Sequence, residues 1–238
     1  MSSDFKFAAL IPAYNEADVI GQTLASCFTI AGLAGIIVAN DGSRDTTEDI
    51  AVRSGAFVCG FERRLGKGAA LELAARTLEQ VRPFGNLDAV LLLDADLGSS
   101  AANAAALLEP LRAGRADMTV ALLPSPTKKA GFGLVKGLAA EGIATFGGGF
   151  QARAPLSGQR ALTIDCLNRV RPFARGFAVE VDMTLKALRQ KQSVVEVPLD
   201  LGHREYGRNL RGFLHRGRQF WDIYQLLNSY RKAKALPV

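Results

Sequence analysis

Residues 87–97 read LDAVLLLDADL, an apolar run that ends in two aspartates, Asp94 and Asp96. A short aliphatic run of this kind is typical of a buried strand. Two carboxylates so close together repel each other unless a cation offsets their charge, and hard oxygen ligands suit Mg²⁺ or Mn²⁺. The stretch therefore predicts a strand whose end holds Mg²⁺ or Mn²⁺ together with a diphosphate.

Similar strand-like runs alternate with helical patterns on both sides of this stretch. Apolar residues recur at helical spacing in residues 20–27 and 71–81. This alternation predicts the α/β class, with one mostly parallel sheet flanked by helices and with ligands at the carboxyl ends of its strands. The strands are expected at residues 5–11, 35–39, 56–61, 87–93, 118–122 and 193–198.

Size and composition fit a single domain of this class. The chain has 238 residues, 48% of them apolar, and its longest apolar runs fall far short of the roughly 18 residues that a membrane span needs. The first residues, MSSDFKFAALIP, end their apolar run at a proline, so we expect no secretory signal and a cytoplasmic protein. The three cysteines, Cys27, Cys59 and Cys166, are widely spaced in apolar surroundings and are predicted to be core thiols.

The net charge of +6 is confined to the C-terminal end of the chain. Residues 203–238 hold eight Lys or Arg against two acidic residues, and the remainder of the sequence is neutral. Such a local excess, with few aromatic residues elsewhere, argues against nucleic-acid binding and for a local anionic partner.

The same end of the chain predicts a basic amphipathic helix. Three settings for its apolar face are left open: the face docks on the domain, lies on an anionic membrane surface, or binds a peptide-like partner or second subunit. If the apolar face lies on an anionic membrane surface, we expect the protein to be peripheral at the inner face of the membrane. The residues expected on the apolar face are Leu210, Phe213, Leu214, Trp221, Tyr224 and Leu227.

Three further turns place polar groups at strand ends. Residues 12–16 (PAYNE) follow the first strand and precede a helix, whose N-terminus presents N–H groups to an anion. Asp41, after the second strand, is expected to point into the same crevice as Glu16.

Lys67 lies between two glycines at the start of the third helix, where it can meet a phosphate. The spacing to Gly60 is wrong for a Walker loop, which argues against ATPase or GTPase chemistry.

Residues 124–158 interrupt the regular pattern. This segment carries eight glycines around a short amphipathic piece at 134–143. Because glycine-rich loops are mobile, the segment is predicted to be a flap over an active site, and a short surface helix between loose loops is the alternative.

Four motifs resemble, in this order and spacing, those of the family 2 glycosyltransferases, which have the nucleotide-sugar-binding GT-A fold. The resemblance implies a GT-A domain over residues 1–205, followed by the basic helix over 206–238. The motifs are IPAYNE at 11–16, NDGSRDTT at 40–47, GKG at 66–68 and LDADL at 93–97.

Two subgroups of that family are similar further along the chain. They are the dolichyl- or polyprenyl-phosphate sugar synthases and the glucosyl-3-phosphoglycerate synthases. The second group's pattern RPLSGE…GYGVEI resembles residues 154–160 and 176–181, although Gln159 stands where that group tends to have Glu.

The resemblance also implies roles for individual residues. The nucleotide-sugar site would comprise Pro12, Ala13, Tyr14, Glu16, Asp41, Lys67, Asp94, Arg204 and Arg208. The metal ligands would be Asp94, Asp96 and His203, and the acceptor would meet Ser157, Gly158, Gln159 and Arg160.

One carboxylate must take the acceptor's proton if the sugar's configuration inverts, and the candidates are Glu180 and Asp182. Residues two apart on a helix do not share a face, so one of the two is expected to be structural. Glu180 is the favoured base.

Together these observations predict a metal-dependent glycosyltransferase that moves a hexose from a UDP- or GDP-linked sugar. The acceptor would be a small phosphorylated or hydroxylated molecule or a polyprenyl phosphate. A sugar-1-phosphate nucleotidyltransferase is disfavoured because residues 12–16 lack glycine, and a non-catalytic sugar-nucleotide-binding module is disfavoured by the paired aspartates. The donor, the acceptor, the stereochemistry and a homodimeric state are left open.

Overall fold

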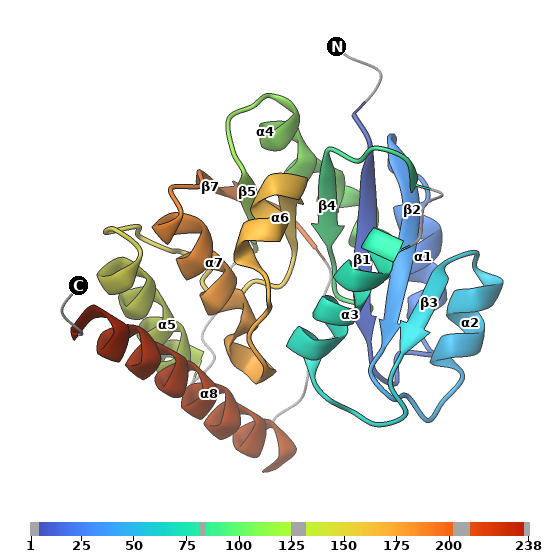
Figure 1. Cartoon of the computed structure of the whole chain (residues 1–238). Helices are drawn as coiled ribbons and strands as arrows, with labels where there is room; N and C mark the ends of the chain where they lie inside the picture. The colour runs from blue at the N-terminus through green and yellow to red at the C-terminus, as the bar shows by residue number, and fades with distance from the viewer. Residues whose placement is uncertain (1–4, 81–83, 125–131, 202–209, 236–238) are drawn as a thin grey trace.

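A computed structural model describes residues 5–80, 84–124, 132–201 and 210–235 of the chain (Figure 1). A seven-stranded sheet lies at its centre, in the order β3-β2-β1-β4-β6-β5-β7. The strands are β1 (Phe7–Ala13), β2 (Leu33–Asn40), β3 (Phe57–Gly60), β4 (Ala89–Leu92), β5 (Met118–Leu122), β6 (Arg160–Thr163) and β7 (Val194–Pro198).

The predicted α/β class is confirmed, and all six expected strands are present. Strands β1 to β4 pair in parallel, as do β5 and β7. The strand that the sequence did not indicate is β6, which runs antiparallel between β4 and β5. Its four residues, RALT, begin with a charged arginine and contain no apolar run, so they carry no strand signal.

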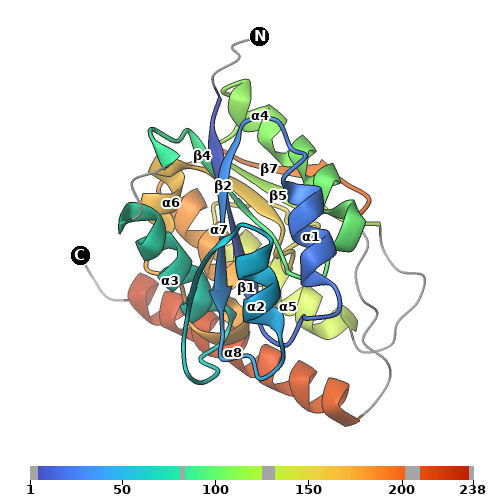
Figure 2. The ribbon, with the colours of Figure 1, turned by 90° about the vertical axis from the view of Figure 1, so that its right-hand side faces the viewer.

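Helices cover both faces of this sheet. Figure 2 shows α3 and α6 on one side of the strands and α1 on the other. The helical elements are α1 (Ile20–Cys27), α2 (Thr47–Arg53), α3 (Lys67–Gln80), the 3₁₀ helix η2 (Gly98–Leu107), α4 (Leu108–Arg112), α5 (Phe132–Phe146), α6 (Ile164–Val170), the 3₁₀ turn η3 (Gly176–Ala178), α7 (Val179–Arg189) and α8 (Leu210–Ala235).

Alternate residues of the central strands feed two separate cores. In β1, Ala9 and Ile11 pack with α1 and η2, whereas Leu10 packs with α3 and α6. Because both faces of the sheet are covered, its strands read as nearly continuous apolar runs. The buried Cys27 and Cys166 belong to these cores, and burial raises the pKa of each thiol to about 12.

A third apolar core lies away from the sheet, between α5, α7 and α8. Figure 1 shows these three helices side by side. Val135 and Ile143 of α5 are buried there with Val181 of α7 and with Ile223 and Leu227 of α8. The amphipathic piece expected at 134–143 is therefore part of a longer helix whose apolar face is covered.

Helix α8 docks through a stripe that overlaps only partly with the expected one. Ile223 and Leu227 are buried and Tyr230 packs beside them, whereas Trp221 and Tyr224, which lie further round the helix, are exposed. Of the predicted apolar face, Leu227 is buried against the domain, whereas Trp221 and Tyr224 are exposed. The side chains of Leu210, Phe213 and Leu214 lie outside the described part of the chain. Among the described helices, none is long and apolar enough to cross a bilayer.

Candidate active site

The carboxyl ends of β1, β2 and β4 meet at one edge of the sheet. These strands are adjacent and parallel. The hydrogen bonding between β1 and β2 continues just beyond β2, where the Asp41 N–H donates to the carbonyl of Ala13 over 2.8 Å. Asp94 and Asp96 follow β4 at the same edge. The crevice at such an edge is where ligands bind in parallel sheets.

Four polar side chains come together at this edge, and we call them the Lys67 cluster: Lys67, Asp94, Gln159 and Glu180. The Lys67 Nζ lies 2.6 Å from Asp94 Oδ1 and 3.0 Å from Glu180 Oε1. Gln159 Nε2 donates to the other oxygen of Asp94 over 2.6 Å. The four residues come from α3, the turn after β4, the loop before β6, and α7. The fold thus joins segments more than 100 residues apart around one ammonium group.

The charge on Lys67 is fixed by its two neighbours. Burial disfavours the ammonium form, but the carboxylates of Asp94 and Glu180 outweigh burial and raise the pKa of Lys67 above its ordinary value. One cation between two carboxylates leaves the cluster with an excess negative charge. A further cation at this edge is therefore electrostatically favourable.

Gly158 closes over the cluster without a side chain. A Cβ atom at this position would come closer than 3.0 Å to Lys67 Nζ and would lie 3.1 Å from Asp94 Oδ2. The loop can lie this close to the ammonium group only because residue 158 is a glycine.

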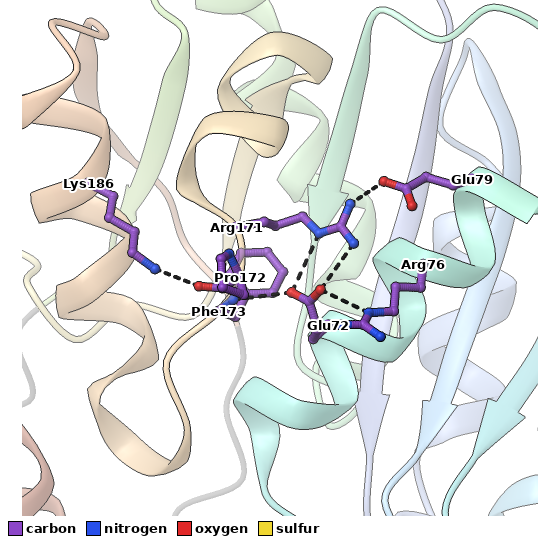
Figure 3. A network of polar contacts seen from close by, with 7 residues as sticks. All are labelled: Glu72, Arg76, Glu79, Arg171, Pro172, Phe173 and Lys186. Atoms are coloured by element: carbon purple, nitrogen blue, oxygen red, sulfur yellow. Dashed lines mark hydrogen bonds and ion pairs between the residues drawn. The ribbon is translucent and has the colours of Figure 1, made fainter.

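An ion-pair network joins α3 to the loop that precedes α7 (Figure 3). Glu72 of α3 accepts hydrogen bonds from Arg171, from Arg76 and from the Phe173 N–H, each over 3.1 Å. Arg171 also pairs with Glu79. Because Lys67 begins α3 and Glu180 lies in α7, this network fixes the two helices that carry the cluster.

Glu72 gives this network a pH dependence. Burial favours its neutral form, but the hydrogen bonds from Arg171, Phe173 and Arg76 outweigh burial and lower its pKa. The stabilisation is therefore present above the carboxyl's ordinary pKa of about 4.3 and is lost as the pH falls through the lowered folded-state pKa. We expect Glu72→Gln to lower the free energy of unfolding by about 1–2 kcal/mol at pH 7 and by less at pH 4, measured by urea denaturation.

The matched control is Glu109→Gln, which removes a more exposed pair with Arg112 on α4. It should cost under about 0.5 kcal/mol at either pH. An equal loss for Glu72→Gln at pH 7 and pH 4 would show that the network does not act through its charge.

Asp182 does not belong to the Lys67 cluster. Its Oδ1 accepts a hydrogen bond from the Tyr230 hydroxyl over 2.8 Å, and its Oδ2 lies 2.8 Å from Lys186 Nζ. Tyr230 belongs to α8 and Lys186 to the next turn of α7, so the carboxylate is held on a different face of α7 from Glu180. Asp182 therefore helps to dock α8, and this arrangement disfavours it as the catalytic base relative to Glu180, which stays a prediction.

This assignment predicts a stability effect without a catalytic one. Tyr230→Phe removes the hydrogen bond to Asp182 and should lower the free energy of unfolding by about 1–2 kcal/mol, with nucleotide release from a sugar donor unchanged. Tyr224→Phe, in which the lost hydroxyl belongs to an exposed ring of the same helix, is the control and should change neither. Loss of turnover at unchanged stability in Tyr230→Phe would return Asp182 to the catalytic site.

A second contact ties α8 to the turn before Glu180. The Phe177 N–H donates to Asp222 Oδ2 over 3.0 Å. Gly176 has φ of +70°, and a Cβ there would come closer than 3.0 Å to that same oxygen. Helix α8 therefore supports the start of α7 from outside the sheet.

The predicted nucleoside residues lie around the turn after β1. Asp41 is buried and accepts hydrogen bonds from the N–H groups of Leu65 and Gly66 over 2.7 and 2.8 Å. The Arg64 guanidinium lies over the ring of Tyr14, 4.2 Å from its centroid. Asp41 thus holds the loop that leads into Lys67, a function that its position after β2 did not reveal.

The other predicted residues of this turn lie in β1 and just after it. Pro12 and Ala13 end the strand, and Ala13 is buried. The N–H of Glu16 donates to the Thr47 hydroxyl over 2.8 Å, which joins this turn to the start of α2.

The four predicted acceptor residues divide into two groups. Gln159 and Gly158 line the cluster, and Ser157 precedes them. Arg160 is fully buried, so it does not lie at the mouth of an acceptor site. Its side chain donates to the Ser157 carbonyl over 2.9 Å and to the Thr184 hydroxyl over 2.8 Å, and burial lowers its pKa to about 10. Arg160 holds the loop at 157–159 against α7, and its burial disfavours the predicted direct contact with an acceptor.

Several supporting residues could not be found from the sequence. Glu196 of β7 accepts hydrogen bonds from the N–H groups of Arg153 and Ala154, 2.8 and 2.7 Å away. Like the pairing of Glu72 with Arg171, this contact joins residues more than 40 positions apart. No local pattern signals it.

The predicted metal ligands do not fit a divalent ion equally well. Both oxygens of Asp94 accept from Lys67 and Gln159, so a second cation on this carboxylate would lie against the ammonium group. Asp96 is only partly buried in the turn after β4. Its carboxylate oxygens are of the kind that Mg²⁺ and Mn²⁺ prefer, so Asp96 stays the predicted ligand of the pair. His203, Arg204 and Arg208 lie outside the described residues, and within the described ranges no three His, Cys, Asp or Glu side chains form a metal-binding group.

Comparison with known proteins agrees with this geometry. The chain is 28% identical over 226 residues to Glycosyltransferase AglJ of Haloferax volcanii, covering 91% of this chain and 70% of that protein. It also resembles solved structures of glucosyl-3-phosphoglycerate synthase from Mycobacterium tuberculosis. The complex with Mn²⁺, UDP-glucose and phosphoglyceric acid has a TM-score of 0.75 at 25% identity, covering 95% of this chain and 79% of that chain. The complex with Mg²⁺ and UDP has a TM-score of 0.74 at 26% identity, with the same coverage of each.

Residues 8–136, more than half of the chain, match the family Glycosyl transferase family 2. This match sets aside the nucleotidyltransferase alternative, and the structural similarity agrees with the predicted GT-A fold. The chain belongs to glycosyl transferase family 2.

Proposed function

We propose that this protein transfers a hexose from a UDP-linked sugar, with a divalent metal ion, to an anionic or hydroxylated acceptor. The observation that carries the proposal is the Lys67 cluster, which presents one fixed cation and an excess of carboxylate at the ligand-binding edge of the sheet. The synthase from Mycobacterium tuberculosis, which has the same fold, binds UDP-glucose with Mn²⁺. UDP-glucose is therefore the first donor to test.

The nucleoside half of the donor would lie on the turn after β1. Tyr14 supplies an aromatic surface there, together with Pro12 and Ala13. Asp41 keeps lone pairs beyond the two hydrogen bonds it accepts from the loop, so it can also accept from the base. Glu16, at the same edge, completes this side of the donor site.

The diphosphate would lie between Lys67 and Asp96. Cleavage of the bond from sugar to phosphate leaves negative charge on the diphosphate, and a fixed ammonium group stabilises that charge as it develops. Asp96 would hold the metal, with His203 as a further ligand, and the metal would act as a Lewis acid on the diphosphate oxygens. Arg204 and Arg208 would add positive charge on the same side. Asp94, held by Lys67 and Gln159, would accept a hydrogen bond from a ribose hydroxyl.

Glu180 is the carboxylate in position to take a proton from a hydroxyl acceptor. It lies within the cluster, whereas Asp182 is held by α8. An acceptor that is already an anionic phosphate needs no such base. The role of Glu180 then reduces to fixing Lys67 in place.

The acceptor would enter from the ends of β5 and β7. A cavity of about 450 Å³ lies there, lined by Leu122, Pro124, Arg153 and Asp200 among others. The guanidinium of Arg153 suits an anionic acceptor. Ser157, Gly158 and Gln159 lie in the loop between Arg153 and the cluster, where they would meet the bound acceptor.

Asp96→Ala tests the proposal. The variant should abolish the Mn²⁺-dependent rise in melting temperature that UDP-glucose gives, and it should lower nucleotide release by at least about 100-fold, because the charge of the leaving diphosphate is no longer offset. Asp200→Ala, at another carboxylate near the acceptor cavity, should keep the Mn²⁺-dependent shift. Unchanged turnover in Asp96→Ala would defeat the proposal.

A further inference from the structure

The outer side of α8 carries three exposed aromatic rings, which we call the α8 aromatic patch. Phe220 is 39% exposed, Trp221 56% and Tyr224 40%. The rings pack on one another, with centroids 6.4 Å apart for Phe220 and Tyr224 and 5.8 Å for Trp221 and Tyr224. A contiguous exposed apolar patch of this kind marks an interaction surface more often than a scattered single residue does.

The contacts that the structure shows between α8 and the domain come from other residues of the helix. Ile223 and Leu227 are buried there, and Asp222 and Tyr230 make hydrogen bonds to the rest of the chain. Within the described part of the chain, each of the three aromatic side chains keeps at least 39% of its surface exposed and accessible to a partner.

The charge of α8 indicates the chemistry of that partner. Residues 210–235 contain six Lys or Arg and a single acidic residue, Asp222. Asp222 accepts the Phe177 N–H and so is directed toward the domain. At 3.6 residues per turn, Arg231 and Lys232, which are both exposed, follow Trp221 and Tyr224 along the outer side. The outer side thus combines aromatic rings with positive charge.

We propose that the α8 aromatic patch binds the surface of an anionic lipid bilayer. Trp and Tyr prefer the boundary between headgroups and acyl chains, and neighbouring Lys and Arg are attracted to anionic headgroups. A second copy of the chain fits less well, because a two-fold interface would place this cationic surface opposite itself. The proposal rests on exposure and charge and does not depend on the transferase activity.

Such binding would place the catalytic edge beside the membrane. Asp222 adjoins Trp221 and holds the turn at Phe177 that leads to Glu180. A helix bound through its outer side would keep this inner contact unchanged.

Trp221 is the single tryptophan of the chain, so its fluorescence reports on the patch alone. The full-length protein is mixed with vesicles of phosphatidylcholine containing phosphatidylglycerol, and with vesicles of phosphatidylcholine alone. We expect the emission to shift to shorter wavelength, and brominated lipid to quench it, only with the anionic vesicles. High salt should weaken the binding.

Co-sedimentation with the same vesicles tests the residues. Tyr224→Ser should weaken binding by about tenfold, since it removes an aromatic ring from the interface. Phe28→Ser, at an exposed phenylalanine beside α1, should leave it unchanged. Circular dichroism confirms that both variants fold.

Three results would overturn the proposal. The first is no spectral change with anionic vesicles, and the second is equal binding to both kinds of vesicle. The third is a shift that grows with protein concentration in the absence of lipid, which would assign the patch to self-association.

Discussion

Lys67→Met should lower nucleotide release from UDP-glucose by about 100- to 1000-fold, the effect typical of losing one fixed charge that stabilises a transition state. Methionine is close to lysine in length and removes only the ammonium group. That group lies 2.6 Å from Asp94 and 3.0 Å from Glu180. Without it, the two carboxylates repel each other, and the leaving diphosphate meets net negative charge.

The variant must be compared with a lysine in a similar setting. Lys186→Met removes a lysine that lies 2.8 Å from the buried carboxylate of Asp182, outside the cluster. It should lower stability and leave turnover nearly unchanged. The measurement is kcat for nucleotide release, with urea denaturation of both variants. Equal turnover in Lys67→Met and the wild type would remove Lys67 from the reaction.

Gly158→Ala should lower turnover by about tenfold or more, although it adds a single methyl group. The new Cβ would come closer than 3.0 Å to Lys67 Nζ. Because that atom ends a flexible side chain, the lysine is displaced and the backbone is not. A displacement of about 1 Å is enough to cost up to 100-fold in rate. Since the overlap is relieved by a side chain, the free energy of unfolding should change by less than about 1 kcal/mol.

Gly137→Ala is the matched control, because a Cβ at Gly137 of α5 meets nothing within 4 Å. Alanine there favours the helix and should raise stability by about 0.5–1 kcal/mol, with turnover unchanged. The pair of variants is assayed for nucleotide release and for thermal unfolding. A Gly158→Ala enzyme with wild-type turnover would show that the position of the ammonium group does not limit the reaction.

Much of the fold could be predicted from the sequence because the strands are buried on both faces. The run at 89–93 is apolar throughout, and its end therefore marks the ligand edge of the sheet. Lys67 and Asp94 could be identified because each follows a strand or begins a helix at that edge. Strand β6 could not, because its position between β4 and β5 is set by pairing, not by an apolar pattern.

The placements of Asp182 and Arg160 away from the cluster have a common physical cause. Both are charged residues close in sequence to predicted site residues, and both are buried by partners that are distant along the chain. Asp182 is held by Tyr230 of α8, and Arg160 by Thr184 of α7. Helical spacing separates Glu180 from Asp182, but it does not say which of them faces the site.

The docking face of helix α8 was predicted only in part, for a different reason. It has apolar residues on two sides, so spacing alone does not identify the side that packs. The packing with α5 and α7 selects Ile223 and Leu227 and leaves Trp221 and Tyr224 exposed.

The most direct test of the account is a crystal structure of the protein with UDP-glucose and Mn²⁺. We predict that the diphosphate lies at the carboxyl ends of β1, β2 and β4, in contact with Lys67, and that Asp96 ligates the metal. A diphosphate bound at any other edge of the sheet, or metal and nucleotide bound away from Lys67 and Asp96, would contradict the account.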